Sequence, residues 1–255
     1  MQQRVLELKN VCKRFGGVVT AENVCLALNA GEIHGLIGPN GAGKTTLINL
    51  ISGITEHDSG EIYFMGANIS GLPAFKRGRM GIGRTFQVPR FLNKSSVRDN
   101  LLLGLDLRNG VGDAKSFLGK PKVNLEAELE PLMKAAGFSL SLNADISGMP
   151  FGQLKLLEIV RALLSNPKVL LVDEPAAGLN SKEIDRVSDL LNLATRDRNI
   201  TVLLIEHRMD LVVDICKELH VLVFGKIIAE GAPEIVTALP EVIEAYLGRN
   251  DDDQD

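Results

Sequence analysis

The chain has 255 residues, of which 45% are hydrophobic and 24% are charged, as is ordinary for one globular domain with or without a smaller subdomain. Its net charge of −4 argues against an overall basic field for nucleic acid or anionic lipid. No apolar run approaches the roughly 20 residues of a transmembrane helix. Cys12, Cys25 and Cys216 lack metal-ligand spacing, which favours a reducing cytosol. We therefore expect no nucleic-acid partner, and membrane contact only through other subunits.

The hydrophobic pattern predicts strands that alternate with helices. Ser96 is expected to cap a helix, Gly137 to end one, and the Gly- and Lys-rich stretch 106–121 to form a loop or insertion. Along the chain the predicted elements are strands 5–8, 24–28 and 33–37, a helix from residue 45, strands 62–65 and 81–86, helices 96–103, 125–136 and 152–165, strand 168–172, helix 181–196, strand 201–205, helix 209–216, and strands 219–224 and 226–230.

This alternation predicts an α/β fold with a doubly wound core. The stretch from about residue 90 to 165 is mostly helical in pattern and is expected to form a separate helical lobe. Residues 249–255 carry Asp251, Asp252, Asp253 and Asp255, and this acidic tail is interpreted as a solvated, flexible terminus.

A glycine-rich turn between a predicted strand and a predicted helix is the first sign of chemistry. It fits the phosphate-loop pattern, in which two glycines four apart precede Lys and Ser/Thr. Glycines let backbone N–H groups surround phosphate oxygens, the lysine reaches the β- and γ-phosphates, and the following hydroxyl binds Mg²⁺. The predicted ATP-binding residues here are Gly38, Pro39, Asn40, Gly41, Ala42, Gly43, Lys44, Thr45 and Thr46.

A second signal is the apolar strand 169–172, which ends in Asp173 and Glu174. Asp173 suits a water-mediated contact to Mg²⁺, and Glu174 suits the polarisation of an attacking water. The alternative is an acidic strand end that caps the next turn. Because Asp173 and Glu174 occur in the same chain as a phosphate loop, we favour the catalytic interpretation.

The segment 149–153 adds a third element, and together these resemble the ABC ATPase family over about residues 4–248. The family signature is Leu-Ser-Gly-Gly-Gln, of which only Gly152 and Gln153 match. The resemblance implies a phosphate-loop NTPase core with a mixed sheet, an antiparallel N-terminal β subdomain and a helical signature subdomain. It also implies that Phe151, Gly152 and Gln153 close on the γ-phosphate bound by a second subunit. Pro150 removes the serine contact of the family signature.

Further residues match the family in order along the chain. Gln87 matches the glutamine that senses Mg²⁺ and contacts the helical lobe, and His207 matches the histidine that reaches the γ-phosphate. Phe15 stands where the family places an aromatic ring against adenine, although an aromatic near a strand end is commonly a core residue. Asn180 replaces the usual aspartate and so removes a carboxylate contact across the dimer. The resemblance thus implies catalysis by Glu174, His207 and Gln87, and Mg²⁺ binding by Thr45, Gln87 and Asp173.

A narrower resemblance is to the ATPases of branched-chain amino acid importers. It rests on four segments: 150–153 with 158–162, 173–180, 205–207 and 245–248. This implies a second ABC ATPase subunit in a homo- or heterodimer, two membrane permeases, and a periplasmic or extracellular solute-binding protein. The chain would then lie at the cytoplasmic face of the membrane, held there by the permeases. Urea import, lipopolysaccharide or lipid transport, and a soluble ATPase of cofactor assembly are the alternatives.

Overall fold

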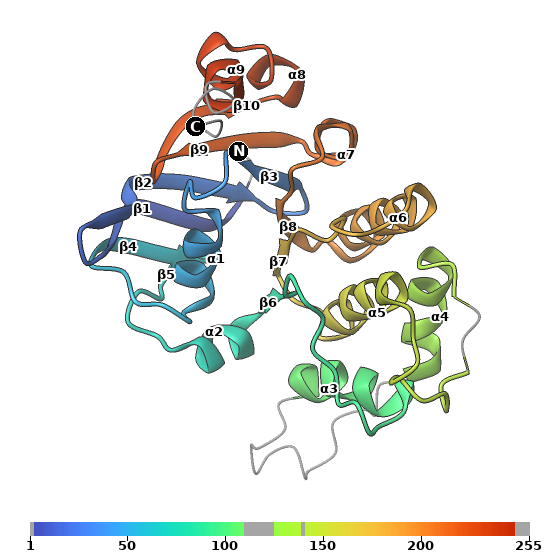
Figure 1. Ribbon diagram of the computed structural model, residues 1–255. Coiled ribbons are helices and arrows are strands. Elements are labelled where there is room, and N and C mark those ends of the chain that lie inside the picture. The colour runs from blue at the N-terminus through green and yellow to red at the C-terminus, as the bar shows by residue number, and fades with distance from the viewer. Residues whose placement is uncertain (1–2, 110–124, 139–140, 248–255) are drawn as a thin grey trace.

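The computed structural model describes residues 3–109, 125–138 and 141–247 and has a mixed α/β architecture built on two sheets (Figure 1). The first sheet is antiparallel and has the order β2 (Val18–Asn29), β1 (Arg4–Phe15), β4 (Ser59–Phe64) and β5 (Ala67–Asn68). This sheet corresponds to the N-terminal antiparallel subdomain that the family resemblance implies.

The second sheet is the mixed sheet of the core. Its order is β10 (Lys226–Gly231), β9 (Glu218–Val223), β3 (Ile33–Ile37), β8 (Thr201–Ile205), β7 (Val169–Asp173) and β6 (Ile82–Arg84). All neighbours are parallel except β10, which pairs antiparallel with β9. Every residue of β3, β7 and β8 is buried, as expected for mostly apolar strands that are covered on both faces. The buried polar residues among them are His34, Asp173 and Thr201.

Helices and the first sheet cover the two faces of this core (Figure 1). The helix α1 (Lys44–Ser52) shares one hydrophobic cluster with the antiparallel sheet. A second cluster joins the other face to α3 (Val97–Asn109), α4 (Leu125–Ala135), α5 (Phe151–Leu164) and α6 (Ser181–Arg198). The remaining helices are α2 (Ala74–Met80), α7 (Met209–Ile215), α8 (Pro233–Val236) and α9 (Pro240–Leu247). None of the helices in these ranges is both long and apolar enough to cross a membrane.

Most predicted elements are present, and the differences have local causes. β1 and β2 are longer than predicted because Asn10 and Asn23, at φ 49° and 50°, continue the strands through irregular register instead of ending them. The loop predicted from residue 106 is wrong at 106–109, where α3 continues behind the buried Leu105. Residues 110–121 of that loop and the acidic tail 249–255 lie outside the described residues.

The predicted ends of two helices are confirmed. Ser96 Oγ accepts a hydrogen bond from the N–H of Asp99 at 3.1 Å, which caps α3. Gly137 has φ 67° and follows α4, and the N–H of Phe138 returns to the carbonyl of Met133 at 2.9 Å.

Arg77 of α2 is a buried charged residue that the sequence analysis does not predict. Its guanidinium donates to four backbone carbonyls, those of Leu50 at 2.7 Å, Ile51 at 2.9 Å, Ser70 at 2.9 Å and Leu72 at 2.8 Å. Leu50 and Ile51 belong to the last turn of α1, where the helix itself cannot pair every carbonyl. The carbonyl of Leu50 also accepts from the N–H of the capping residue Gly53 at 3.3 Å. A cation at this end of α1 also complements the helix dipole. Arg77 therefore holds the helix that follows the glycine-rich loop.

We expect Arg77→Leu to lower the free energy of unfolding by about 3 kcal/mol, because it leaves several buried carbonyls without a donor. Urea denaturation monitored by circular dichroism measures the change. Arg79→Leu, on the exposed side of the same helix, is the matched control and should change the stability by less than about 0.5 kcal/mol. Equal effects of the two substitutions would contradict the role given to Arg77.

Candidate active site

The loop 38–43 connects β3 to α1, as the glycine pattern predicts. Gly38 and Gly43 have φ of 151° and 107°, which L side chains rarely adopt. A Cβ at Gly38 would overlap the carbonyl oxygen of Leu222, and one at Gly43 would overlap that of Thr20. Both positions therefore require glycine for backbone geometry and for the close approach of neighbouring backbone.

Lys44 is buried at the start of α1, and its ammonium lies within the loop. Nζ donates to the carbonyl oxygens of Gly38 at 2.7 Å and Pro39 at 3.0 Å. Phosphate oxygens would offer this ammonium charged acceptors, which make stronger hydrogen bonds than carbonyls do. Thr45 and Thr46 follow in the first turn, and Thr45 is exposed. In this geometry the loop and the start of α1 could bind the phosphate groups of a nucleotide.

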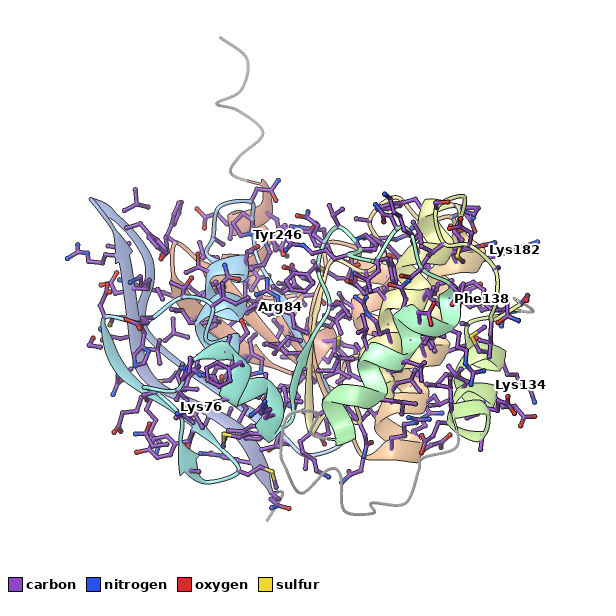
Figure 2. The ribbon with its side chains drawn as sticks, turned by 90° about the horizontal axis from the view of Figure 1, so that it is seen from below. Lys76, Arg84, Lys134, Phe138, Lys182 and Tyr246 are labelled. Atoms are coloured by element: carbon purple, nitrogen blue, oxygen red, sulfur yellow. The ribbon has the colours of Figure 1, made fainter. Side chains whose placement is uncertain are left out.

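We expect Lys44→Ala to weaken ATP binding about tenfold or more, because a hydrogen bond to a charged group contributes roughly 1.5–3 kcal/mol. Isothermal titration with ATP measures the affinity. Lys76→Ala, on the exposed side of α2 (Figure 2), controls for the loss of a positive charge and should leave the affinity unchanged. Wild-type affinity in Lys44→Ala would contradict the phosphate-loop assignment.

Asp173 ends β7 beside the cation of Arg84. Arg84 Nη2 lies 3.6 Å from Asp173 Oδ2, and Arg84 Nη1 donates to Asn49 Oδ1 of α1 at 2.6 Å. Burial raises the pKa of Asp173, and the charge of Arg84 opposes that rise. Arg84 therefore links α1 to the carboxylate at the end of β7. The sequence analysis did not single out this arginine.

The next residue, Glu174, has a strained backbone, and both its N–H and its carbonyl make hydrogen bonds. Its φ of 48° lies in the left-handed region, where a non-glycine residue costs on the order of 1 kcal/mol. Its N–H donates to the carbonyl of Ile205 at 3.0 Å, and its carbonyl accepts from Lys155 Nζ at 2.6 Å. Burial lowers the pKa of Lys155, and nearby carboxylates, Glu206 first among them, oppose this. No motif in the sequence indicates this contact of Lys155 with the backbone of Glu174.

Two other predicted site residues, Gln87 and His207, contact the carboxylate of Glu174. Gln87 Nε2 donates to Glu174 Oε2 at 2.8 Å, and His207 Nε2 lies 3.1 Å from Glu174 Oε1. Gln87 follows β6 and His207 follows β8, so these residues come from separate parts of the chain. The structure thus brings together the side chains to which the family resemblance assigns catalysis.

Glu206 fixes the loop that carries His207, and it too was missed. It is buried directly after β8, and its Oε1 accepts from the N–H of Ala176 at 2.6 Å. Its Oε2 accepts from the N–H of His207 at 3.0 Å. Glu206 therefore joins the loop after β7 to the loop after β8. An acidic residue directly after the apolar run 202–205 was the available signal.

The segment Phe151–Gln153 begins α5, and the contacts described below join it to residues outside the phosphate loop. Phe151 is 46% exposed, stands beside Gly178, and has Lys155 Nζ 5.5 Å from its ring centre. The ring of Phe151 is therefore presented outward, at the first position of α5. This suits a contact with another subunit.

Gly152 is packed against α6 through a cap. Asn180 accepts a hydrogen bond from the N–H of Glu183, and the Glu183 side chain returns to the N–H of Asn180, which forms a capping box. A Cβ at Gly152 would overlap the Glu183 carboxylate. Asn180 thus has a structural role at the position where the family usually has aspartate.

Phe15 lies at the end of β1, in the turn before β2. Its side chain is 50% exposed, and Lys13 Nζ is 5.2 Å from the ring centre. Its placement excludes the core role that was the alternative. The start of β2 approaches the loop, because the Thr20 carbonyl lies against Gly43. The contact of Phe15 with adenine stays a prediction.

Comparison with known proteins places these features in a family. The family model described as ABC transporter matches residues 21–177, and the model described as branched-chain amino acid ATP-binding cassette transporter matches residues 226–252. The solved ADP conformation of an ATP-binding cassette of an ABC transporter superimposes with a TM-score of 0.81 at 34% identity. It covers 96% of this chain and 99% of that one.

Two curated relatives are similar over nearly their whole length. One is the high-affinity branched-chain amino acid transport ATP-binding protein LivG of Escherichia coli strain K12, 38% identical over 254 residues, with 97% of this chain and 99% of the relative covered. The other is the high-affinity branched-chain amino acid transport ATP-binding protein BraF of Pseudomonas aeruginosa, 35% identical with the same coverage.

Proposed function

The chain belongs to the ABC transporter family of ATPases, and on that basis we propose that it powers the import of branched-chain amino acids through two membrane permeases. The C-terminal family match at residues 226–252 and the names of LivG and BraF support this substrate class. The permeases and an external solute-binding protein select the amino acid. This chain supplies the energy of ATP hydrolysis.

The observation that carries the proposal is the contact of Gln87 and His207 with the Glu174 carboxylate. A carboxylate held in this way is placed to take a proton from the water that attacks the γ-phosphate. His207 is adjacent and positions that phosphate, while Lys44 holds the β- and γ-phosphates and Phe15 stacks on adenine. Gln87 couples the nucleotide state of the site to the permease.

Mg²⁺ would be held by the Thr45 hydroxyl, by Gln87 and, through water, by Asp173, where it neutralises charge on the phosphates. The donor set fits this ion, because Mg²⁺ prefers oxygen ligands and retains several waters. Burial raises the pKa of Asp173, and the charge of Arg84 and, more weakly, that of Lys44 oppose this rise.

A second ATPase subunit would complete each site. Phe151 at the start of α5 is 46% exposed, and Gly152 and Gln153 follow it in the first turn of that helix. The N-terminal N–H groups of a helix bind anions. We therefore assign these residues to the γ-phosphate bound by the partner, in a homo- or heterodimer.

A cleft of about 430 Å³ between α2, β6, α3 and α5 is the proposed permease contact. Its lining includes the half-exposed Met80 and Leu103 and the basic side chains of Arg79 and Lys168. Phe86 also lines it, and the next residue, Gln87, contacts Glu174. A permease segment bound here would touch Phe86, whose neighbour Gln87 contacts the catalytic carboxylate of Glu174. Such docking would hold the chain peripherally at the cytoplasmic face of the membrane.

We expect Leu103→Asp to reduce co-purification of the ATPase with its permeases at least fivefold, because it puts a charge into an apolar contact of this cleft. Leu103 is 40% exposed, so the chain should fold normally. Ile235→Asp, at a residue of α8 that is 66% exposed, is the matched control and should retain the permeases. Equal recovery with both variants would contradict the assignment of the cleft, and a wild-type chain that never recovers membrane subunits would favour a soluble assembly ATPase.

A further inference from the structure

Two buried histidines lie side by side on neighbouring strands of the mixed sheet. His34 of β3 and His220 of β9 are 0% and 1% exposed, and their rings stack with centroids 5.7 Å apart. Both side chains point to the face of the mixed sheet that is covered by the antiparallel sheet, the face shared with Leu36 and Leu222. His34 lies near the start of β3, whereas the phosphate loop follows its end.

Three carboxylates approach these two rings. Glu218 Oε2 lies 3.4 Å from His34 Nδ1, Glu230 Oε2 lies 3.5 Å from His220 Nδ1, and Glu32 Oε2 lies 3.7 Å from His34 Nε2. Burial, followed by the charges of Glu230 and Glu32, raises the pKa of the Glu218 carboxyl. The cluster therefore concentrates negative charge beside two imidazoles, an environment that a divalent cation would stabilise.

The separations of the potential ligand atoms suit a tetrahedral metal ion. His34 Nδ1 is 3.4 Å from Glu218 Oε2 and 3.4 Å from His220 Nε2. One potential ligand atom from each of the three residues lies within 4.8 Å of the other two. Metal–ligand bonds of 2.0–2.1 Å in a tetrahedron place ligand atoms about 3.3–3.4 Å apart. An imidazole pair with one carboxylate is also a common zinc ligand set.

The outer atoms of the cluster suit the same ion. His220 Nδ1 is buried without a hydrogen-bond partner, and it faces Glu230. Metal-bound histidines donate their other N–H to a carboxylate, the geometry that Glu230 offers His220 and that Glu32 offers His34. His34 Nε2 accepts from the N–H of Asn29 at 3.0 Å. Binding through Nδ1 moves the His34 proton to Nε2 and gives up that one hydrogen bond.

We propose that His34, Glu218 and His220 bind a structural zinc ion that joins β3 to β9. Glu218 and Glu230 are partly exposed and give the ion a path from solvent. Water can occupy the fourth position. Because the ligands lie at the opposite end of β3 from the phosphate loop, the ion stabilises the sheet and takes no part in hydrolysis.

The test uses the purified untagged chain, freed of metal by a chelator and titrated with ZnCl₂ against a chromogenic zinc chelator. We expect one zinc per chain and a rise in melting temperature with ZnCl₂ that MgCl₂ does not reproduce. Glu218→Gln and His220→Gln should each weaken zinc binding at least tenfold, and Glu230→Gln about tenfold. Glu218 and Glu230 are exposed enough that their variants should fold even if His220→Gln does not.

His207→Gln is the control for zinc bound at the ATP site, and it should leave the stoichiometry at one. The proposal is overturned if the wild-type chain binds no zinc. It is equally overturned if Glu218→Gln and Glu230→Gln bind zinc like the wild type, or if His207→Gln abolishes binding.

Discussion

Glu174→Gln should reduce ATP hydrolysis about 10²–10⁴-fold while ATP binding is retained, because base catalysis contributes rate factors of that order. The substituted amide has the size of the carboxylate and can still accept a hydrogen bond from Gln87 or His207, which now contact Glu174 at 2.8 Å and 3.1 Å. It cannot take a proton from water. Steady-state hydrolysis and an ATP titration measure the two effects separately.

The ATP-bound variant should also accumulate as a dimer, since hydrolysis no longer separates the subunits. Size-exclusion chromatography with light scattering detects this species. Glu241→Gln, in the first turn of α9 and exposed, is the control for loss of a carboxylate and should hydrolyse ATP normally. Normal turnover by Glu174→Gln would show that another residue is the base.

Gly152→Asp should abolish ATP hydrolysis by the assembled transporter, because it puts negative charge against the γ-phosphate bound by the partner subunit. The structure adds a second effect within the same chain. Any Cβ at this position meets the Glu183 carboxylate, so the substitution also disturbs the cap of α6. A helix cap contributes about 1 kcal/mol to stability.

Gly152→Ala separates these effects, since it displaces Glu183 without adding charge. We expect it to lower stability slightly and to retain most of the activity, and we expect Pro150→Ser to change activity only modestly. Steady-state hydrolysis by transporters carrying each substitution is the measurement. If Gly152→Asp and Gly152→Ala lost activity equally, packing rather than charge at the phosphate would explain the loss, and full activity of Gly152→Asp would exclude this segment from the site.

The parts of the fold that could be predicted are those with a strong local pattern. The buried strands β7 and β8 contain the apolar runs 169–172 and 202–205, and the predicted and observed bounds of β3 and β8 coincide. Helix α2 was missed because its one buried residue is Arg77, a charge whose partners are distant carbonyls. Helices α8 and α9 were also missed, although each has a proline at its start, a usual first residue of a helix.

The candidate site divides in the same way. Lys44, Gln87, Glu174 and His207 were predictable because motif order along the chain identifies them. Lys155 and Glu206 act on backbone atoms of loops that come together only in the folded chain. Their partners are carbonyl and N–H groups that every residue has, so no spacing in the sequence could indicate the pairs.

Uptake of labelled leucine by liposomes containing the assembled transporter tests the central claim most directly. With ATP enclosed in the liposomes and the solute-binding protein outside, we predict uptake of leucine, but not of urea, that stops without ATP. The same transporter carrying Glu174→Gln should take up leucine at least a hundredfold more slowly. ATP-dependent uptake of urea without leucine, or leucine uptake that Glu174→Gln leaves unchanged, would contradict the account.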